Sequence, residues 1–214
     1  MKLTESTYLE YFDALITGNR DKCAEIVDSL QENKVELIDL YEKLFQRSMY
    51  RIGKLWNQNK ITVAEEHIAT YITDTLVDVV CSRLNKAEKK NKTIVVTCVE
   101  KEFHCIGAKI IVDYFEFLGW DVIMLGANTP VSELLKVIED KKPDLIGISN
   151  SFYLNILRLL KFIETIQKKF PDQKIIVGGQ ALSEGKDDLL EKYRNVNYIA
   201  SLREIDAYLK EKKI

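Results

Sequence analysis

The hydrophobic pattern of the chain changes near residue 92, and the pattern beyond this point restricts the fold most. Short apolar runs rich in β-branched residues alternate there with segments of helical period. Strands that are apolar throughout are buried on both faces, and strands separated by helices pair in parallel. Right-handed crossovers then predict an α/β fold with a doubly wound, five-stranded parallel sheet. The expected strands are 93–99, 122–125, 145–148, 175–177 and 198–199, and the expected helices are 105–118, 131–140, 154–170, 182–193 and 202–210.

The first 88 residues follow a different pattern, with no proline and only two glycines. Apolar residues recur at intervals of three or four, which is typical of amphipathic helices. Thr62 followed by Glu65 forms a capping-box pattern that predicts a helix over residues 63–84. Four helices with short turns predict a small four-helix bundle. The expected domain plan is a helical cap at residues 1–88, a cationic linker at 89–92 and a Rossmann-like domain at 93–214.

The composition excludes several classes of protein. Lys and Arg total 31 against 33 Asp and Glu, so the net charge of −2 creates no strong field for nucleic acid or an anionic membrane. The sequence contains no apolar run of bilayer length and no signal-peptide pattern at its start. Four cysteines without a CxxC pair predict free thiols in a reducing compartment. We therefore expect a cytoplasmic protein that binds neither nucleic acid nor a membrane directly.

The first candidate site follows the first expected strand. Open parallel sheets bind ligands beyond the carboxyl ends of their strands, where Glu102, His104 and Gly107 are expected. A carboxylate two residues before a histidine can accept its ring N–H, which leaves the other nitrogen as a metal ligand or a base. Gly107 removes a side chain where a bulky group approaches. The chain has only two histidines, so a metal at His104 must bring most of its own ligands, as a macrocycle does.

Two further segments lie after later strands, namely Ser149 to Ser151 and the pair Gly178 and Gly179. All three segments also have a plain structural interpretation. The E-x-H-x-x-G segment alone fits an ordinary surface loop, and the serines fit helix caps. The glycine pair fits either a turn or a bare backbone against which a flat ligand packs. Neither GxGxxG nor GxxxxGK[ST] occurs, so a nucleotide site is not indicated.

The spacing of the three segments resembles the signature of cobalamin-binding domains, D-x-H-x-x-G, then S-x-L, then G-G. Here 41 residues separate Gly107 from Ser149, and 26 separate Ser151 from Gly178. Glu102 stands where the signature has Asp, and Ser151 where it has Leu. The signature is found in methionine synthase, corrinoid methyltransferase proteins and cobalamin-dependent mutases. A four-helix cap precedes the domain in methionine synthase and its relatives.

The resemblance implies that cobalamin binds base-off, with His104 as the lower axial ligand of cobalt, and that the corrin is held between cap and sheet domain. It also implies a role for each residue of the signature. Glu102 orients His104, Gly107 makes room for the nucleotide tail, Ser149 and Ser151 belong to the binding segment near the buried benzimidazole, and Gly178 and Gly179 line its slot.

A pattern in the cap resembles a narrower group. Trp56 is followed after nine residues by Glu66 and His67, with Val63 in between. This is similar to the cap of light-sensing adenosylcobalamin-binding regulators, in which the Trp and Val shelter the adenosyl group and the Glu and His contact it or its surroundings. The structural alternative is a core tryptophan and a solvated pair on a helix. Those regulators also carry a DNA-binding domain, which this sequence does not contain.

These patterns lead to one expected function and two alternatives. We expect a photoreceptor or cofactor-sensing module that binds adenosylcobalamin, has no catalytic activity by itself, and acts through self-association or a separate regulator protein. The main alternative is a corrinoid methyl carrier that uses methylcobalamin and docks on methyltransferase proteins. A cobalamin store or chaperone is the third hypothesis.

Overall fold

The computed structural model describes residues 1–183, 185, 187–212 and 214. The chain divides into two compact units, Met1–Leu84 and Asn85–Ile214. The expected linker at residues 89–92 belongs to the second unit, where the amide of Lys90 donates a hydrogen bond to the carbonyl of Gly119 at 2.9 Å. Among the described residues, no helix is both long enough and apolar enough to cross a bilayer.

The first unit consists of four helical rods, and the predicted helical cap is confirmed. Three rods are single helices, α1 (Glu5–Ile16), α2 (Arg20–Glu32) and α5 (Val63–Ser82). The remaining rod is continuous through α3 (Leu37–Asp39), the π-helical segment η1 (Leu40–Gln46) and α4 (Arg47–Asn57). The predicted capping box opens α5, because Thr62 Oγ1 accepts from the amide of Glu65 at 3.2 Å and the Glu65 carboxylate accepts from the amide of Thr62 at 2.7 Å.

The second unit contains the predicted five-stranded parallel sheet, with strand order β2-β1-β3-β4-β5. The strands are β1 (Thr93–Cys98), β2 (Asp121–Gly126), β3 (Leu145–Ser149), β4 (Ile175–Gly178) and β5 (Val196–Tyr198). The helices between and after them are α6 (Ile106–Phe117), α7 (Val131–Lys141), α8 (Ile156–Lys169) and α9 (Leu202–Lys212). The last strand begins two residues before the predicted run, and the other strands match their predicted positions closely.

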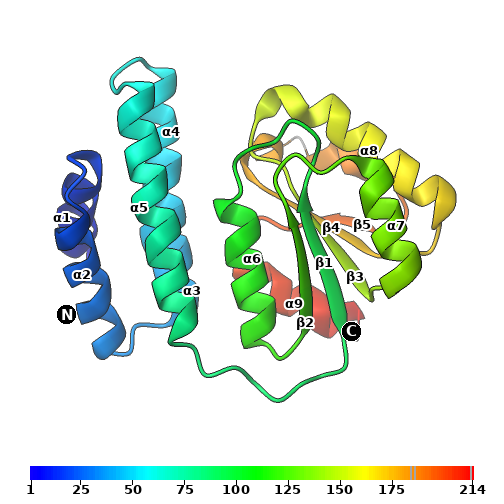
Figure 1. Cartoon of the computed structure of the whole chain (residues 1–214), viewed down its shortest axis with the longest axis horizontal. Helices are drawn as coiled ribbons and strands as arrows, with labels where there is room; N and C mark the ends of the chain where they lie inside the picture. Colours follow the sequence, from blue (N-terminus) through cyan, green and yellow to red (C-terminus); the bar gives the residue numbers. More distant parts are fainter. Residues whose placement is uncertain (184, 186, 213) are drawn as a thin grey trace. The chain divides into compact units, whose positions relative to one another are not determined.

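Helices cover both faces of the sheet. Figure 1 shows α6 and α9 on one face and α7 and α8 on the other, and the hydroxyl of Tyr114 in α6 donates to Asp206 of α9 at 2.8 Å. On the opposite face, Ile148 and Val177 of the sheet are buried in one cluster with Leu159 of α8. Burial on both faces explains why these strands are apolar throughout their length.

One predicted helix is wrong. The described residues of the segment 182–193 form no α-helix. The short 3₁₀ turn η3 (Gln180–Leu182) ends at the first residue of this segment, and a second one, η4 (Asp187–Leu190), lies inside it. Gly185 between them has φ of +77°, a left-handed conformation that a right-handed helix cannot include. Residues 184 and 186 of the predicted helix lie outside the described residues. A third 3₁₀ turn, η2 (Tyr153–Asn155), precedes α8.

The exits of β3 and β4 touch through their backbones at Gly179. This residue has φ of +104°, and a Cβ placed on it would lie 2.4 Å from the carbonyl oxygen of Asn150. The neighbouring Gly178 has an ordinary φ, and a Cβ there would meet the carbonyl oxygen of Ile199 at 3.4 Å, close to ordinary contact. Only the second glycine of the pair is therefore required by the fold itself.

Gly179→Ala is expected to lower the free energy of unfolding of the chain by about 2 kcal/mol or more, because it combines a disfavoured φ with a backbone clash. Gly178→Ala is the matched control and should cost clearly less. Chemical denaturation of both variants and the wild type measures the difference. Equal losses in the two variants would contradict the role assigned to Gly179.

Candidate functional site

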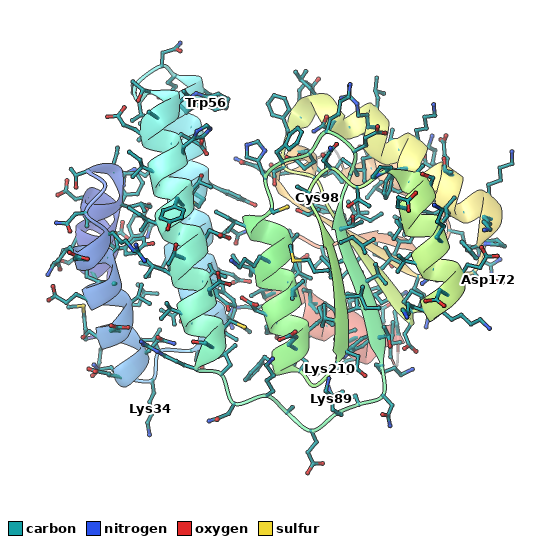
Figure 2. All side chains as sticks on the ribbon, viewed as in Figure 1. Lys34, Trp56, Lys89, Cys98, Asp172 and Lys210 are labelled. Atoms are coloured by element: carbon teal, nitrogen blue, oxygen red, sulfur yellow. The ribbon has the colours of Figure 1, made fainter. Side chains whose placement is uncertain are left out.

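The carboxyl ends of β1 and β3 form the edge of the sheet where a ligand is expected. These strands are neighbours in the sheet but not in the sequence, so the chain leaves them toward opposite sides. Open α/β sheets bind ligands at such a divergence, beyond the carboxyl ends of the strands. The residues after β1, after β3 and after β4 border this edge, and the label of Cys98 in Figure 2 marks the end of β1.

Glu102 joins two of these loops through one buried carboxylate. Its side chain is 0% exposed. Oε1 accepts hydrogen bonds from Nδ1 of His104 at 2.7 Å and from the amide of His104 at 3.0 Å. Oε2 accepts from the amides of Ser151 at 3.0 Å and Phe152 at 2.8 Å. The carboxylate therefore holds the loop after β1 against the loop after β3 and fixes His104 between them.

The hydrogen bonds keep Glu102 ionised and set the tautomer of His104. Burial alone would raise the pKa of Glu102, but the hydrogen bonds from the side chain and amide of His104 and the amide of Phe152 outweigh burial and lower the pKa to about 2. An ionised carboxylate only accepts, so Nδ1 of His104 carries the proton that they share. In the neutral imidazole the lone pair then lies on Nε2, the nitrogen suited to a metal. The His104 side chain is 53% exposed, so a large ligand can reach it.

Two residues that the sequence did not indicate complete this network. Asn155 is 2% exposed, and its Nδ2 donates to the carbonyl of Lys101 at 3.1 Å and to Oε2 of Glu102 at 3.4 Å. Arg158 donates from Nη1 to Oδ1 of Asn155 at 2.8 Å, which turns the amide so that Nδ2 faces the carboxylate. The only local signal at Asn155 is its place at a helix start, which is typical of an N-cap.

The remaining predicted residues of the second unit lie beside this network. A Cβ on Gly107, in the first turn of α6, would lie 3.6 Å from Oγ of Ser149. The helix-cap alternative for the serines is not what the structure shows, since α8 is preceded by Asn155 and has no side-chain cap. The side chain of Asn150, 0% exposed, has no hydrogen-bond partner for either polar atom among the described residues.

The four residues predicted in the cap lie around the turn from α4 to α5. Trp56, labelled in Figure 2, is 37% exposed and Val63 is 52% exposed, so neither belongs to the core of the bundle. Glu66 accepts from the hydroxyl of Thr70 at 2.8 Å, and its side chain is 14% exposed. His67 has a 73% exposed side chain with Nε2 3.7 Å from Glu66. Their contact with a cofactor stays a prediction.

Comparison with known protein families identifies the ligand class. Residues 92–204 match a family described as the B12 binding domain, and residues 9–80 match a second family of the same description. The chain belongs to the B12-binding family. Cobalamin binding, predicted from the three segments and their spacing, is thereby confirmed, as is the plan of a helical cap followed by an α/β domain.

Several of the similar proteins are named corrinoid proteins. The chain is 22% identical to trimethylamine corrinoid protein 1 of Methanosarcina acetivorans, over 80% of this chain and 82% of that protein. The solved monomethylamine corrinoid protein of Methanosarcina barkeri has a TM-score of 0.84 at 15% identity and covers 97% of this chain and 99% of that one. The methanol:cobalamin methyltransferase complex MtaBC of the same species gives 0.51 at 16% identity, over 98% and 81%. None of these is a light-sensing regulator, so that expected likeness is not supported.

The described residues suit a corrinoid better than a bare metal ion. No group of three or more His, Cys, Asp and Glu able to hold an ion occurs in the part of the chain that the structure describes. A corrin brings four nitrogen ligands of its own, so a single oriented imidazole would be enough as the protein ligand. The chemistry of the donor set therefore fits the cofactor of the family.

The low pKa of Glu102 predicts a pH-dependent stability in the chain without corrinoid. Folding lowers the pKa from 4.5 to about 2, so the carboxylate stabilises the fold above about pH 4.5, and this contribution is lost as the pH falls toward 2. The difference in free energy of unfolding between wild type and Glu102→Gln should shrink by about 2 kcal/mol from about pH 6 to about pH 3. Glu100→Gln, at an exposed position of the same loop, is the control. A difference independent of pH would contradict the prediction.

Proposed function

We propose that the chain is a corrinoid methyl carrier that holds cobalamin with His104 as the lower axial ligand and delivers a methyl group between methyltransferase proteins. The observation that carries the proposal is the pair of an ionised, buried Glu102 and an exposed His104 at the carboxyl edge of the sheet. The choice of a carrier over a sensor is supported by the relatives, which are named corrinoid proteins of methylamine systems and match both the cap and the sheet domain.

Each residue of the network has a role in this proposal. A bound corrinoid supplies a cobalt centre that takes up a methyl group and gives it away. His104 would bind this cobalt through Nε2, while Glu102 holds the proton on Nδ1 and so makes the imidazole a better donor. Asn155 holds the carboxylate of Glu102 in place by a hydrogen bond, and Arg158 holds Asn155. As the resemblance implies, Gly107 would make room for the nucleotide tail, Ser149 and Ser151 would lie in the binding segment near the benzimidazole, and Gly178 and Gly179 would line its slot.

The proposed partner is a methyltransferase protein. This chain is similar in fold to a chain of the methanol:cobalamin methyltransferase complex MtaBC, so a protein of this fold does occur in a complex with a methyltransferase. A carrier of this kind has no catalytic activity of its own, because donor and acceptor are bound by other proteins. Self-association, expected for a sensor, is not required for a carrier.

His104→Ala is expected to remove the protein ligand of cobalt. The measurement is electron paramagnetic resonance of the Co(II) form, with the protein labelled with ¹⁵N-histidine so that an imidazole ligand changes the nitrogen splitting. Wild type and His67→Ala should show the label on cobalt, and His104→Ala should not. His67→Ala is the matched control because His67 is the other histidine of the chain. The label persisting on cobalt in His104→Ala would contradict the assignment.

Cofactor preference separates the carrier from the sensor. A methyl carrier should bind methylcobalamin at least as tightly as adenosylcobalamin, and its elution volume should be the same in the dark and after illumination. The predicted contacts of the cap, Trp56, Val63, Glu66 and His67, would instead favour adenosylcobalamin if they shelter an adenosyl group. Tighter binding of adenosylcobalamin that is erased by Trp56→Ala, together with light-dependent assembly, would overturn the carrier in favour of the sensor.

A further inference from the structure

Two cysteine side chains meet directly beneath the loop that carries His104. Cys98 is the last residue of β1 and is 0% exposed, whereas Cys105, which directly precedes α6, is partly exposed. Their Sγ atoms lie 3.3 Å apart. Both belong to the second unit, while Cys23 and Cys81 belong to the first.

We propose that Cys98 and Cys105 form a redox modification site, a dithiol that a low-molecular-weight disulfide oxidises to an intramolecular disulfide. The two residues are seven positions apart in the sequence, and their sulfur atoms already converge. A disulfide bond is about 2.05 Å long, so the sulfur atoms need to approach by about 1.2 Å. We expect side-chain rotation and a small shift at the start of α6 to supply an approach of this size.

The reaction proceeds by thiol–disulfide exchange in two steps. Cys105, the more exposed thiol, attacks one sulfur of the reagent, so that the reagent's S–S bond breaks, a mixed disulfide forms on Cys105, and a first small thiol leaves with the proton of Cys105. Cys98 then attacks the Cys105 sulfur, breaks the mixed disulfide and releases a second small thiol with its own proton. Two electrons and two protons pass from the protein to the reagent, which is reduced to two thiols.

Oxidation of the two cysteines is expected to affect His104, because the cysteines flank it in the sequence. This expectation rests on the proposed function, in which His104 binds cobalt. Glu102 and His104 lie inside the segment that the disulfide would close. The Cys98 thiol lies 3.8 Å from the carbonyl oxygen of His104 and donates to it, and oxidation removes this donor. Drawing Cys105 toward β1 also displaces the adjacent His104 from the geometry that its 2.7 Å hydrogen bond to Glu102 requires. Oxidation is therefore expected to weaken corrinoid binding by about tenfold, the lower range for a disturbed supporting group.

The first experiment tests the modification site on the full chain without corrinoid. The protein is equilibrated at increasing ratios of oxidised to reduced glutathione, alkylated, and analysed by intact and peptide mass spectrometry. We expect a loss of two hydrogen atoms and a Cys98–Cys105 cross-linked peptide. Cys98→Ser should accumulate a glutathione adduct on Cys105 instead, and Cys81→Ser should still form the cross-link.

Cys105→Ser, at the partly exposed position, is the second variant and should form no cross-link even if the buried Cys98→Ser fails to fold. A wild-type chain that keeps both thiols at every ratio, or that cross-links other cysteines, overturns the proposal.

The second experiment tests the coupling through the affinity for methylcobalamin of the reduced and oxidised chain, with Cys105→Ser as the variant that should not respond to glutathione. An affinity that is the same in both redox states of the wild type would overturn the coupling to His104. Absence of corrinoid binding in the reduced chain would instead overturn the proposed function, while the cross-linking result would stand.

Discussion

The buried carboxylate of Glu102 is the constraint on which the geometry of the site depends. A charge removed from water is costly unless every lone pair finds a donor. Here the donors are the ring and amide of His104, two amides of the loop after β3, and the amide side chain of Asn155. Because these groups come from two crossover connections of the sheet, the correct packing of the sheet and the orientation of the imidazole cannot be separated.

The replacement of Asp by Glu in the signature becomes understandable in this geometry. The side chain of Glu102 is one methylene longer than that of Asp. Its Oε1 accepts a hydrogen bond from His104, and its Oε2 accepts hydrogen bonds from the amides of Ser151 and Phe152. A shorter side chain would need a shift of the backbone of the loop to reach both groups. The added length is therefore used to bridge the loops, and the distance from carboxylate to Nδ1 stays at 2.7 Å.

The sequence predicted what depends on neighbours along the chain. Periodicity predicted the five-stranded parallel sheet and the helical cap, and the two-residue spacing of Glu102 and His104 predicted their hydrogen bond. Asn155 was missed because its partner Glu102 lies 53 residues away, and only the fold brings them together. The helix predicted over 182–193 failed for the opposite reason, since its apolar spacing is helical but Gly185 takes a left-handed conformation that spacing cannot indicate. Whether the cap residues contact a cofactor depends on both units, so neither the helical pattern of the cap nor the strand pattern of the second unit can predict it alone.

The edge of the sheet that carries His104 combines a rigid interior with an apolar exterior. Below the surface, the Gly179 contact with the Asn150 backbone and the hydrogen bonds of Glu102 hold the loops in one arrangement. On the outside, the loop after β1, the loop after β3 and the start of α8 expose large apolar side chains, namely Phe103, Phe152, Tyr153, Leu154 and Leu157. A fixed polar anchor surrounded by apolar surface is the arrangement that suits a large cofactor, because burial of the apolar groups supplies affinity and the anchor supplies orientation. The ring of Phe152, with its centroid 6.3 Å from that of His104, belongs to both parts, since its amide holds Glu102 while its side chain borders the imidazole.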